Sequence, residues 1–199
     1  MVWDILPSID VFETTAKALE ANGIRVFIVE NGEEAKKKAL ELIPEGFEAM
    51  PMTSVTLDTI GLAQEINESG KYVSVRKKVM AAKEEWEKRA LRSIPKITLG
   101  SIHAVTEDGH VLIASQSGSQ LSGYVYGSEK VIWVVGGQKI VKNTEEGIKR
   151  IYEYVLQLED ARAQKAYGVG SAVNKLLIFN RETVEGRVTL ILVKEKLGF

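Results

Sequence analysis

Short runs of consecutive Val, Ile and Leu residues alternate along the chain with segments of helical periodicity, and this alternation limits the possible folds more than any other feature. The run from Lys130 to Val135 is apolar at nearly every position, which indicates a strand covered on both faces. Apolar residues at spacings of three and four over residues 9–19 and 78–92 indicate amphipathic helices. Buried strands that alternate with helices predict an α/β fold with a largely parallel sheet.

Caps and turn residues place the remaining elements. Helices are expected over residues 9–22, 33–43, 57–68 and 78–92, and after a capping box at residues 143–146. Strands are expected over residues 25–29, 47–52, 72–75, 102–105, 111–114, 130–135, 175–179 and 187–193. Asp108-Gly109 predicts an antiparallel hairpin, which makes the sheet mixed. The prediction is a three-layer α/β/α sandwich with a mixed, mostly parallel open sheet. Residues 1–199 are expected to form one domain, with an amino-terminal helix in residues 1–23 packed on it.

Composition excludes several classes of function. The chain has no cysteine, so it cannot form disulfides, use a thiolate nucleophile, or hold an iron–sulfur cluster or Cys-ligated zinc by itself. Lys and Arg number 26 against 27 Asp and Glu, a balance that argues against nucleic acid as a partner. No basic leader opens the chain, and no apolar run approaches the roughly 20 residues that span a membrane. We therefore expect a cytoplasmic protein without a membrane partner.

Four polar loops are the expected places for chemistry, because ligands of open α/β sheets collect beyond the carboxyl ends of the strands. These loops are residues 53–56, 115–120, 136–139 and 167–175. The second holds three hydroxyls, two amides and a glycine, which suits either an anionic or polyhydroxylated ligand or an ordinary surface turn. The fourth resembles a phosphate cradle in residue type but lacks the G-x-x-x-x-G-K-[ST] spacing, and a helix C-cap at Gly168 is the alternative.

Charged residues and histidines supply further hypotheses. Glu107 and Asp108 share the predicted hairpin tip, where they suit acid–base chemistry or a divalent ion, although turns use the same residues. His103 and His110 flank the hairpin and, without a further ligand, make a poor metal site.

Glu159, Asp160 and Arg162 lie close together in a helical stretch. They predict either a local ion-pair cluster or a place where Arg162 binds a ligand carboxylate or phosphate.

Several segments resemble the LUD domain family, which is named for lactate utilisation proteins. Ala104-Val-Thr-Glu107-Asp-Gly109-His-Val-Leu-Ile is similar to the family pattern A-x-[AT]-E-[TD]-G-x-[LIV]-[LV]. Ser54-Val-Thr56-Leu57 with Ile60-Gly61-Leu62 resembles its S-x-T-L-x-x-I-G-L segment, and residues 131–141 resemble its late strand and K-[IV]-V element. Residues 158–176 are similar to a compact, cysteine-free subgroup of the family.

The resemblance implies the NagB/RpiA/CoA-transferase-like fold, shared by pentose-phosphate isomerases, glucosamine-phosphate deaminases, CoA-transferases and formyltetrahydrofolate cyclo-ligase. It also implies a role in lactate oxidation beside iron–sulfur partner proteins. The chain departs from the cluster-bearing members by lacking every cluster cysteine.

The leading functional prediction is a small-molecule enzyme or enzyme subunit that binds an anionic metabolite, namely a phosphate, a carboxylate or a CoA-like compound. Glu107 is the predicted acid–base residue, and Lys139 and Lys175 are predicted to neutralise the anion. The predicted ligand-binding residues are Ser54, Thr56, Ser117, Gly118, Ser119, Gln120, Gly136, Lys139, Gly170, Ser171 and Lys175. The alternative is a non-catalytic regulatory or scaffold subunit that docks on iron–sulfur redox partners, which the missing cysteines favour. The sequence leaves a homodimer open and names no cofactor.

Overall fold

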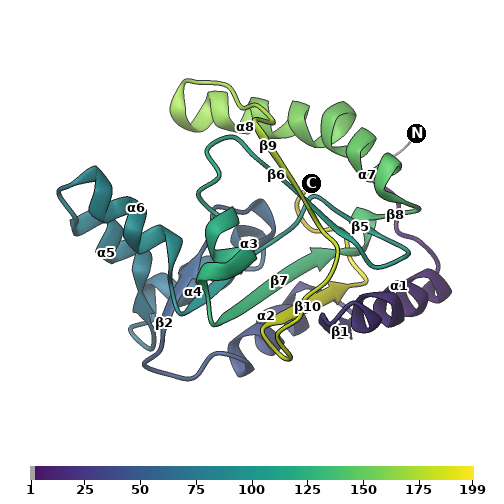
Figure 1. The fold of residues 1–199 in the computed structure, drawn as a ribbon, viewed down its shortest axis with the longest axis horizontal. Helices are drawn as coiled ribbons and strands as arrows, with labels where there is room; N and C mark the ends of the chain where they lie inside the picture. The colour runs from purple at the N-terminus through teal and green to yellow at the C-terminus, as the bar shows by residue number, and fades with distance from the viewer. Residues whose placement is uncertain (1–2) are drawn as a thin grey trace.

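The computed structural model describes residues 3–199 and is drawn as a ribbon in Figure 1. The strands are β1 (Arg25–Val29), β2 (Glu48–Pro51), β3 (Val73–Ser74), β4 (Ile97–Gly100), β5 (Ala104–Thr106), β6 (Val111–Ser115), β7 (Lys130–Gly136), β8 (Ile140–Val141), β9 (Lys175–Phe179) and β10 (Val188–Val193). The helices are α1 (Ile9–Ala21), α2 (Gly32–Glu41), α3 (Val55–Thr59), α4 (Leu62–Glu68), α5 (Val75–Ala81), α6 (Glu85–Ser93), α7 (Thr144–Arg150) and α8 (Leu156–Tyr167). Single turns of π-helix, η1 (Gly123–Gly127) and η3 (Ile151–Val155), and a 3₁₀ turn, η2 (Gly137–Lys139), complete the chain.

A six-stranded, fully parallel sheet forms the centre of the molecule, in the order β1-β10-β7-β4-β2-β3. Both faces are buried, as the apolar run in β7 predicts: Trp133 points into one core cluster and its neighbour Val134 into the other. Helices α2, α3 and α4 pack on one face, and α1 and α5 pack on the other. The predicted α/β fold, with a largely parallel sheet and a packed amino-terminal helix, is confirmed.

A second sheet carries the predicted hairpin, in the order β8-β5-β6-β9. The turn at Asp108-Gly109 does join antiparallel strands, β5 and β6, but they do not pair with the main sheet. Val105 and Ile113 pack toward the main core, whereas Ala104 and Leu112 form a third cluster with η3 and neighbouring side chains. The continuous rod of α7, η3 and α8 lies over the second sheet in Figure 1.

Local signals place the helix starts better than the helix lengths. Asn31 and Asn143 cap α2 and α7 as expected, each accepting a hydrogen bond of 3.0 Å from the backbone three residues on. The helix predicted over residues 57–68 is broken by Gly61, which adopts a left-handed φ of +65°. The helix predicted over residues 78–92 is likewise interrupted, at Ala82, where ψ reaches 137°. Within residues 3–199 no helix is both long and apolar enough to cross a membrane.

Replacing Gly109 with alanine is expected to lower the free energy of unfolding by about 1–3 kcal/mol. Gly109 has a φ of +85°, and an added Cβ would lie 2.5 Å from the carbonyl carbon of Ala18 at the end of α1. The matched control is Gly186→Ala, because Gly186 also has a positive φ but has open space around the added atom. We expect urea denaturation to give a smaller loss there, about 1 kcal/mol or less. Equal losses would show that contact with α1 does not restrict the hairpin tip.

Candidate functional site

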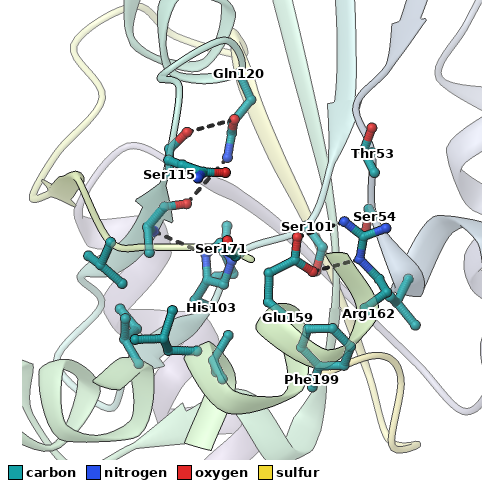
Figure 2. A pocket seen from close by; sticks show the side chains of 18 of the residues that line it. Thr53, Ser54, Ser101, His103, Ser115, Gln120, Glu159, Arg162, Ser171 and Phe199 are labelled. Atoms are coloured by element: carbon teal, nitrogen blue, oxygen red, sulfur yellow. Dashed lines mark hydrogen bonds and ion pairs between the residues drawn. The ribbon is translucent and has the colours of Figure 1, made fainter. Parts of the chain in front are cut away.

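A cavity of about 260 Å³ opens at the carboxyl edge of the main sheet, where β2, β4 and β7 end (Figure 2). Residues following these strands form its floor, and the loop after β6, helix α8 and the segment before β9 form its walls. The polar lining residues are Thr53, Ser54, Thr56, Asp58, Ser101, His103, Ser115, Gln116, Ser117, Gln120, Lys139, Glu159, Arg162 and Ser171. Each of the four polar loops that the sequence predicts beyond the strand ends contributes at least one residue to this lining.

Lys139 is the buried cation of the cavity floor. Its side chain follows β7 on the short turn η2 and is 2% exposed. The ammonium Nζ donates to Thr56 Oγ1 at 3.1 Å, to Ser101 Oγ at 3.0 Å and to the carbonyl of Ile102 at 3.1 Å. No carboxylate among residues 3–199 forms an ion pair with it. Burial, helped by the charge of Arg150, lowers the pKa of Lys139 to about 7.

Arg150 is a second cation behind this floor. It is fully buried at the end of α7, donates from Nη1 to the carbonyl of His103, and stacks over the ring of Tyr154 at 5.3 Å. Its Nε and Nη2 find no hydrogen-bond partner within the described part of the chain. Two buried cations without a carboxylate partner make this end of the cavity electropositive.

His103 is held in one tautomer beside these cations. Its Nδ1 accepts a hydrogen bond of 3.1 Å from the backbone N–H of Ala114, so the ring proton belongs on Nε2. Burial, with the charges of Lys139 and Arg150, lowers the pKa of His103 to about 3. The imidazole is therefore neutral at physiological pH and offers a donor rather than a charge.

Glu159 and Arg162 face the cavity from α8 (Figure 2). The guanidinium Nε and Nη2 each donate to one carboxylate oxygen at 2.7 Å, so the two side chains form a bidentate pair. The hydrogen bond from this pair raises the pKa of Arg162. The predicted local ion pair is confirmed. The alternative, that Arg162 binds a ligand carboxylate or phosphate, stays a prediction, and the pair lies in the cavity wall.

The rim joins two of the predicted loops. Gln116, in the loop after β6, donates to the carbonyl of Gly170 at 3.4 Å, and its own carbonyl accepts from Asn174 and Lys175 at 3.4 Å. The carboxylate of Asp160 on α8 holds Ser171 in place, because its Oδ1 accepts a hydrogen bond of 2.8 Å from the backbone N–H of Ser171. The loop 115–120 and the segment 170–175 thus border the same opening.

The structure gathers some predicted ligand-binding residues and leaves others aside. Those that line the cavity are Ser54, Thr56, Ser117, Gln120, Lys139 and Ser171. Those outside the lining are Gly118, Ser119, Gly136, Gly170 and Lys175. All of these except Gly136 adjoin a lining residue in the chain or, in the case of Lys175, contact the backbone of one. The left-handed C-cap at Gly168, the alternative to a phosphate cradle, is present with a φ of +71°.

Glu107 lies away from the cavity lining, at the tip of the hairpin. Its backbone N–H donates to the carbonyl of Val141 at 2.9 Å, and the neighbouring tip residues accept from Asn22 after α1. Its acid–base role stays a prediction. Within residues 3–199 no group of three or more Asp, Glu or His side chains is placed to hold a metal ion.

Ser101 follows β4 directly and lines the cavity, but it was not among the predicted site residues. Strand β4 itself was not predicted, so the loop after it was not recognised as a strand end. The available signal was Ile97-Thr-Leu-Gly100 after Pro95, a short β-prone run bounded by a proline and a glycine.

Comparison with known proteins finds one family and one fold. The model of the LUD domain matches residues 12–175 of the chain. No curated protein matches it. The structure is similar to the crystal structure of a DUF162 family protein from Deinococcus radiodurans, with a TM-score of 0.58 and 13% sequence identity. That match covers 95% of this chain and 99% of the other. At this identity the similarity shows a shared fold.

Proposed function

The chain belongs to the LUD domain family, and we propose that its cavity binds a small organic anion of the kind a lactate-utilisation-type domain handles. One observation carries the proposal: Lys139 is buried in the cavity floor and Arg150 is buried behind it, and neither has a carboxylate partner among the described residues. An anionic ligand would offset the cost of burying these charges. Two carboxylates, those of Glu159 and Asp58, also line the cavity. They repel an anion only weakly, because Arg162 pairs with Glu159 and Asp58 is exposed.

The lining favours a compact ligand with a carboxylate or phosphate group. The cavity volume of about 260 Å³ lies near roughly 300 Å³, the lower end of the range for pockets that bind drug-sized ligands. Hydroxyl and amide groups make up much of the lining, and Ile151, Val155 and Leu156, which lie along η3 and at the start of α8, add an apolar wall. A hydroxy acid of a few carbons, such as lactate, matches this combination. For a phosphate ester or CoA thioester, only the end of the molecule would enter.

A thermal-shift panel tests the proposal. We expect lactate and other short carboxylates, or sugar phosphates, to raise the melting temperature more than nucleotides and folates, most of whose bulk the cavity does not hold. A ligand at 100 times its dissociation constant adds about 2.7 kcal/mol of stability, which is readily measured. A flat response across carboxylates, phosphates and CoA esters would reject the proposal.

Replacing Arg162 with glutamine is expected to weaken binding of the responding anion by roughly ten- to a hundredfold. The change removes a cation and leaves the carboxylate of Glu159 facing the ligand unpaired. Lys149→Gln is the matched control, since it breaks the similar helix pair with Glu145 at 2.7 Å outside the cavity. Titration calorimetry on both variants measures the difference. If Lys149→Gln weakened binding as much, general electrostatics rather than the cavity would be responsible.

The alternative, a non-catalytic subunit that docks on an iron–sulfur partner, also has an observation in its favour. Met80, Trp86 and Tyr126, on the neighbouring elements α5, α6 and η1, are 80%, 78% and 91% exposed. Large apolar side chains at such exposure suit a protein interface. A flat thermal-shift panel, together with loss of an iron–sulfur partner on Trp86→Ser, would favour this function over ligand binding.

A further inference from the structure

The three oxygen atoms around Lys139 Nζ are not equivalent. The carbonyl of Ile102 can only accept a hydrogen bond. Thr56 Oγ1 lies 3.2 Å from the carbonyl of Leu197, which also accepts from Gln138 Nε2, and 3.3 Å from Ser101 Oγ. The carbonyl can only accept and is the nearer of the two, so the Thr56 hydroxyl donates to it. Thr56 therefore accepts from Lys139. Ser101, at 3.0 Å, is the neighbour whose hydroxyl hydrogen is free to point back toward Nζ.

This arrangement satisfies a neutral amine as well as an ammonium ion. A neutral amine has two N–H donors and one lone pair, which match the Ile102 carbonyl, the Thr56 hydroxyl oxygen and the Ser101 hydroxyl hydrogen. Burial favours the neutral form, because the Lys139 side chain is almost wholly removed from solvent and no carboxylate of the described residues pairs with Nζ. The geometry thus supplies a base next to a serine at the floor of a cavity.

We propose that Ser101 and Lys139 form a nucleophile–base pair that transfers the acyl group of a small ester or thioester. The proposal deepens the proposed function and rests on it, since the acyl compound would occupy the same cavity. A serine activated by an adjacent lysine is one of the known solutions for acyl transfer. The apolar wall of Ile151, Val155 and Leu156 would take the acyl chain.

The chemical steps balance without an external oxidant or reductant. Ser101 Oγ bonds to the acyl carbon while its proton passes to the lone pair of Lys139 Nζ. The bond from the acyl carbon to the alcohol or thiol then breaks, and the leaving group takes the proton from Nζ. Water, or another hydroxyl compound, attacks the resulting Ser101 ester and loses a proton to Nζ, which returns that proton to Ser101 as the ester bond breaks.

His103 would add a neutral hydrogen-bond donor to the Ser101–Lys139 pair. Its Nδ1 is occupied by the backbone N–H of Ala114, so Nε2–H remains for a ligand in the cavity it lines. A fixed neutral donor stabilises the oxyanion that forms when a serine attacks a carbonyl. Arg150, which donates to the carbonyl of His103, holds this segment from behind.

Acylation by p-nitrophenyl acetate tests the proposal directly. We expect the wild-type protein to release nitrophenolate in a burst and to carry one acetyl group, mapped by peptide mass spectrometry to Ser101. Ser101→Ala is expected to abolish the burst, and Lys139→Met to slow it by at least about a hundredfold. Ser69→Ala is the control, because Ser69 is an exposed serine outside the cavity, and it should be acetylated like the wild type. Acetylation elsewhere, or undiminished acetylation of Lys139→Met, would overturn the proposal.

If Lys139→Met does not fold, the pH dependence of the wild-type burst tests whether Lys139 is the base. A lysine base predicts a burst rate that rises through neutral pH and then levels, whereas uncatalysed attack rises steadily with hydroxide. Arg150 is the other charge that acts on Nζ, and burial lowers its pKa only to about 10, so it stays protonated through neutral pH. A steady rise without a plateau would refute the pair. The thermal-shift panel distinguishes anion binding from acyl transfer. If an anion raises the melting temperature but Ser101 is not acylated, the proposed binding function holds and the nucleophile–base pair is rejected.

Discussion

The free energy of unfolding is expected to rise by a few kcal/mol between about pH 7 and pH 10, and Lys139→Met is expected to lose most of this rise. Burial lowers the folded-state pKa of Lys139 to about 7, far below its value of about 10.4 in an unfolded chain. Between these two values the unfolded state binds more protons than the folded state. Stability therefore increases with pH in this window, and it decreases as pH falls toward 7.

Urea denaturation at several pH values from 6 to 10 measures this difference. The matched control is Lys149→Met, because Lys149 is exposed and its pKa is raised by Glu145 rather than lowered by burial. The slope of stability against pH for this control should follow that of the wild type. Parallel curves for Lys139→Met and the wild type would mean that the ammonium form of Lys139 is not penalised in the folded protein.

Replacing Arg187 with methionine is expected to cost about 3–5 kcal/mol of stability. The guanidinium pairs with Glu182 at 2.7 Å, and both side chains are less than 10% exposed. It also donates to the carbonyl of Tyr124 at 2.7 Å, which joins the start of β10 to the turn η1. Methionine keeps much of the stem but leaves the carboxylate of Glu182 buried without its partner.

Two comparisons separate this effect from ordinary surface electrostatics. Lys194→Met breaks an exposed pair with Glu30 at 2.7 Å and should cost less than about 1 kcal/mol. The double variant Arg187→Met, Glu182→Leu should recover much of the loss, because no buried charge is then left unpaired. An Arg187→Met variant as stable as Lys194→Met would show that water reaches the buried pair.

Much of the fold could be predicted because its signals are local. The unbroken apolar run of β7, the Asp108-Gly109 turn and the Asn31 and Asn143 caps each act over a few residues, and the structure contains all four. Strand β4 was missed because it has four residues and its identity depends on β2 and β7, which are distant in sequence. The same limit hid the second sheet, since no local pattern shows which sheet a hairpin joins.

The candidate site was predictable only as a set of loops. Strand ends and polar composition pointed to Ser54 and Lys139, but not to the burial that changes the chemistry of the lysine. That burial arises from residues distant in sequence: the groups that contact Nζ belong to Thr56, Ser101 and Ile102, which are 83, 38 and 37 positions away. Ser101 is the clearest case: its type is ordinary, and only its position 3.0 Å from Nζ gives it significance.

The turn η3 determines the helical phase of everything after it. A π-helical turn accommodates an extra residue, and each residue in an α-helix advances the side-chain direction by about 100°. Ile151 and Val155 within this turn, and Glu159 and Arg162 beyond it, all face the cavity. Deleting one residue of the turn would restore regular α-helix but rotate the Glu159–Arg162 pair away from the opening. A deletion of one exposed residue of this turn should therefore impair ligand binding more than folding.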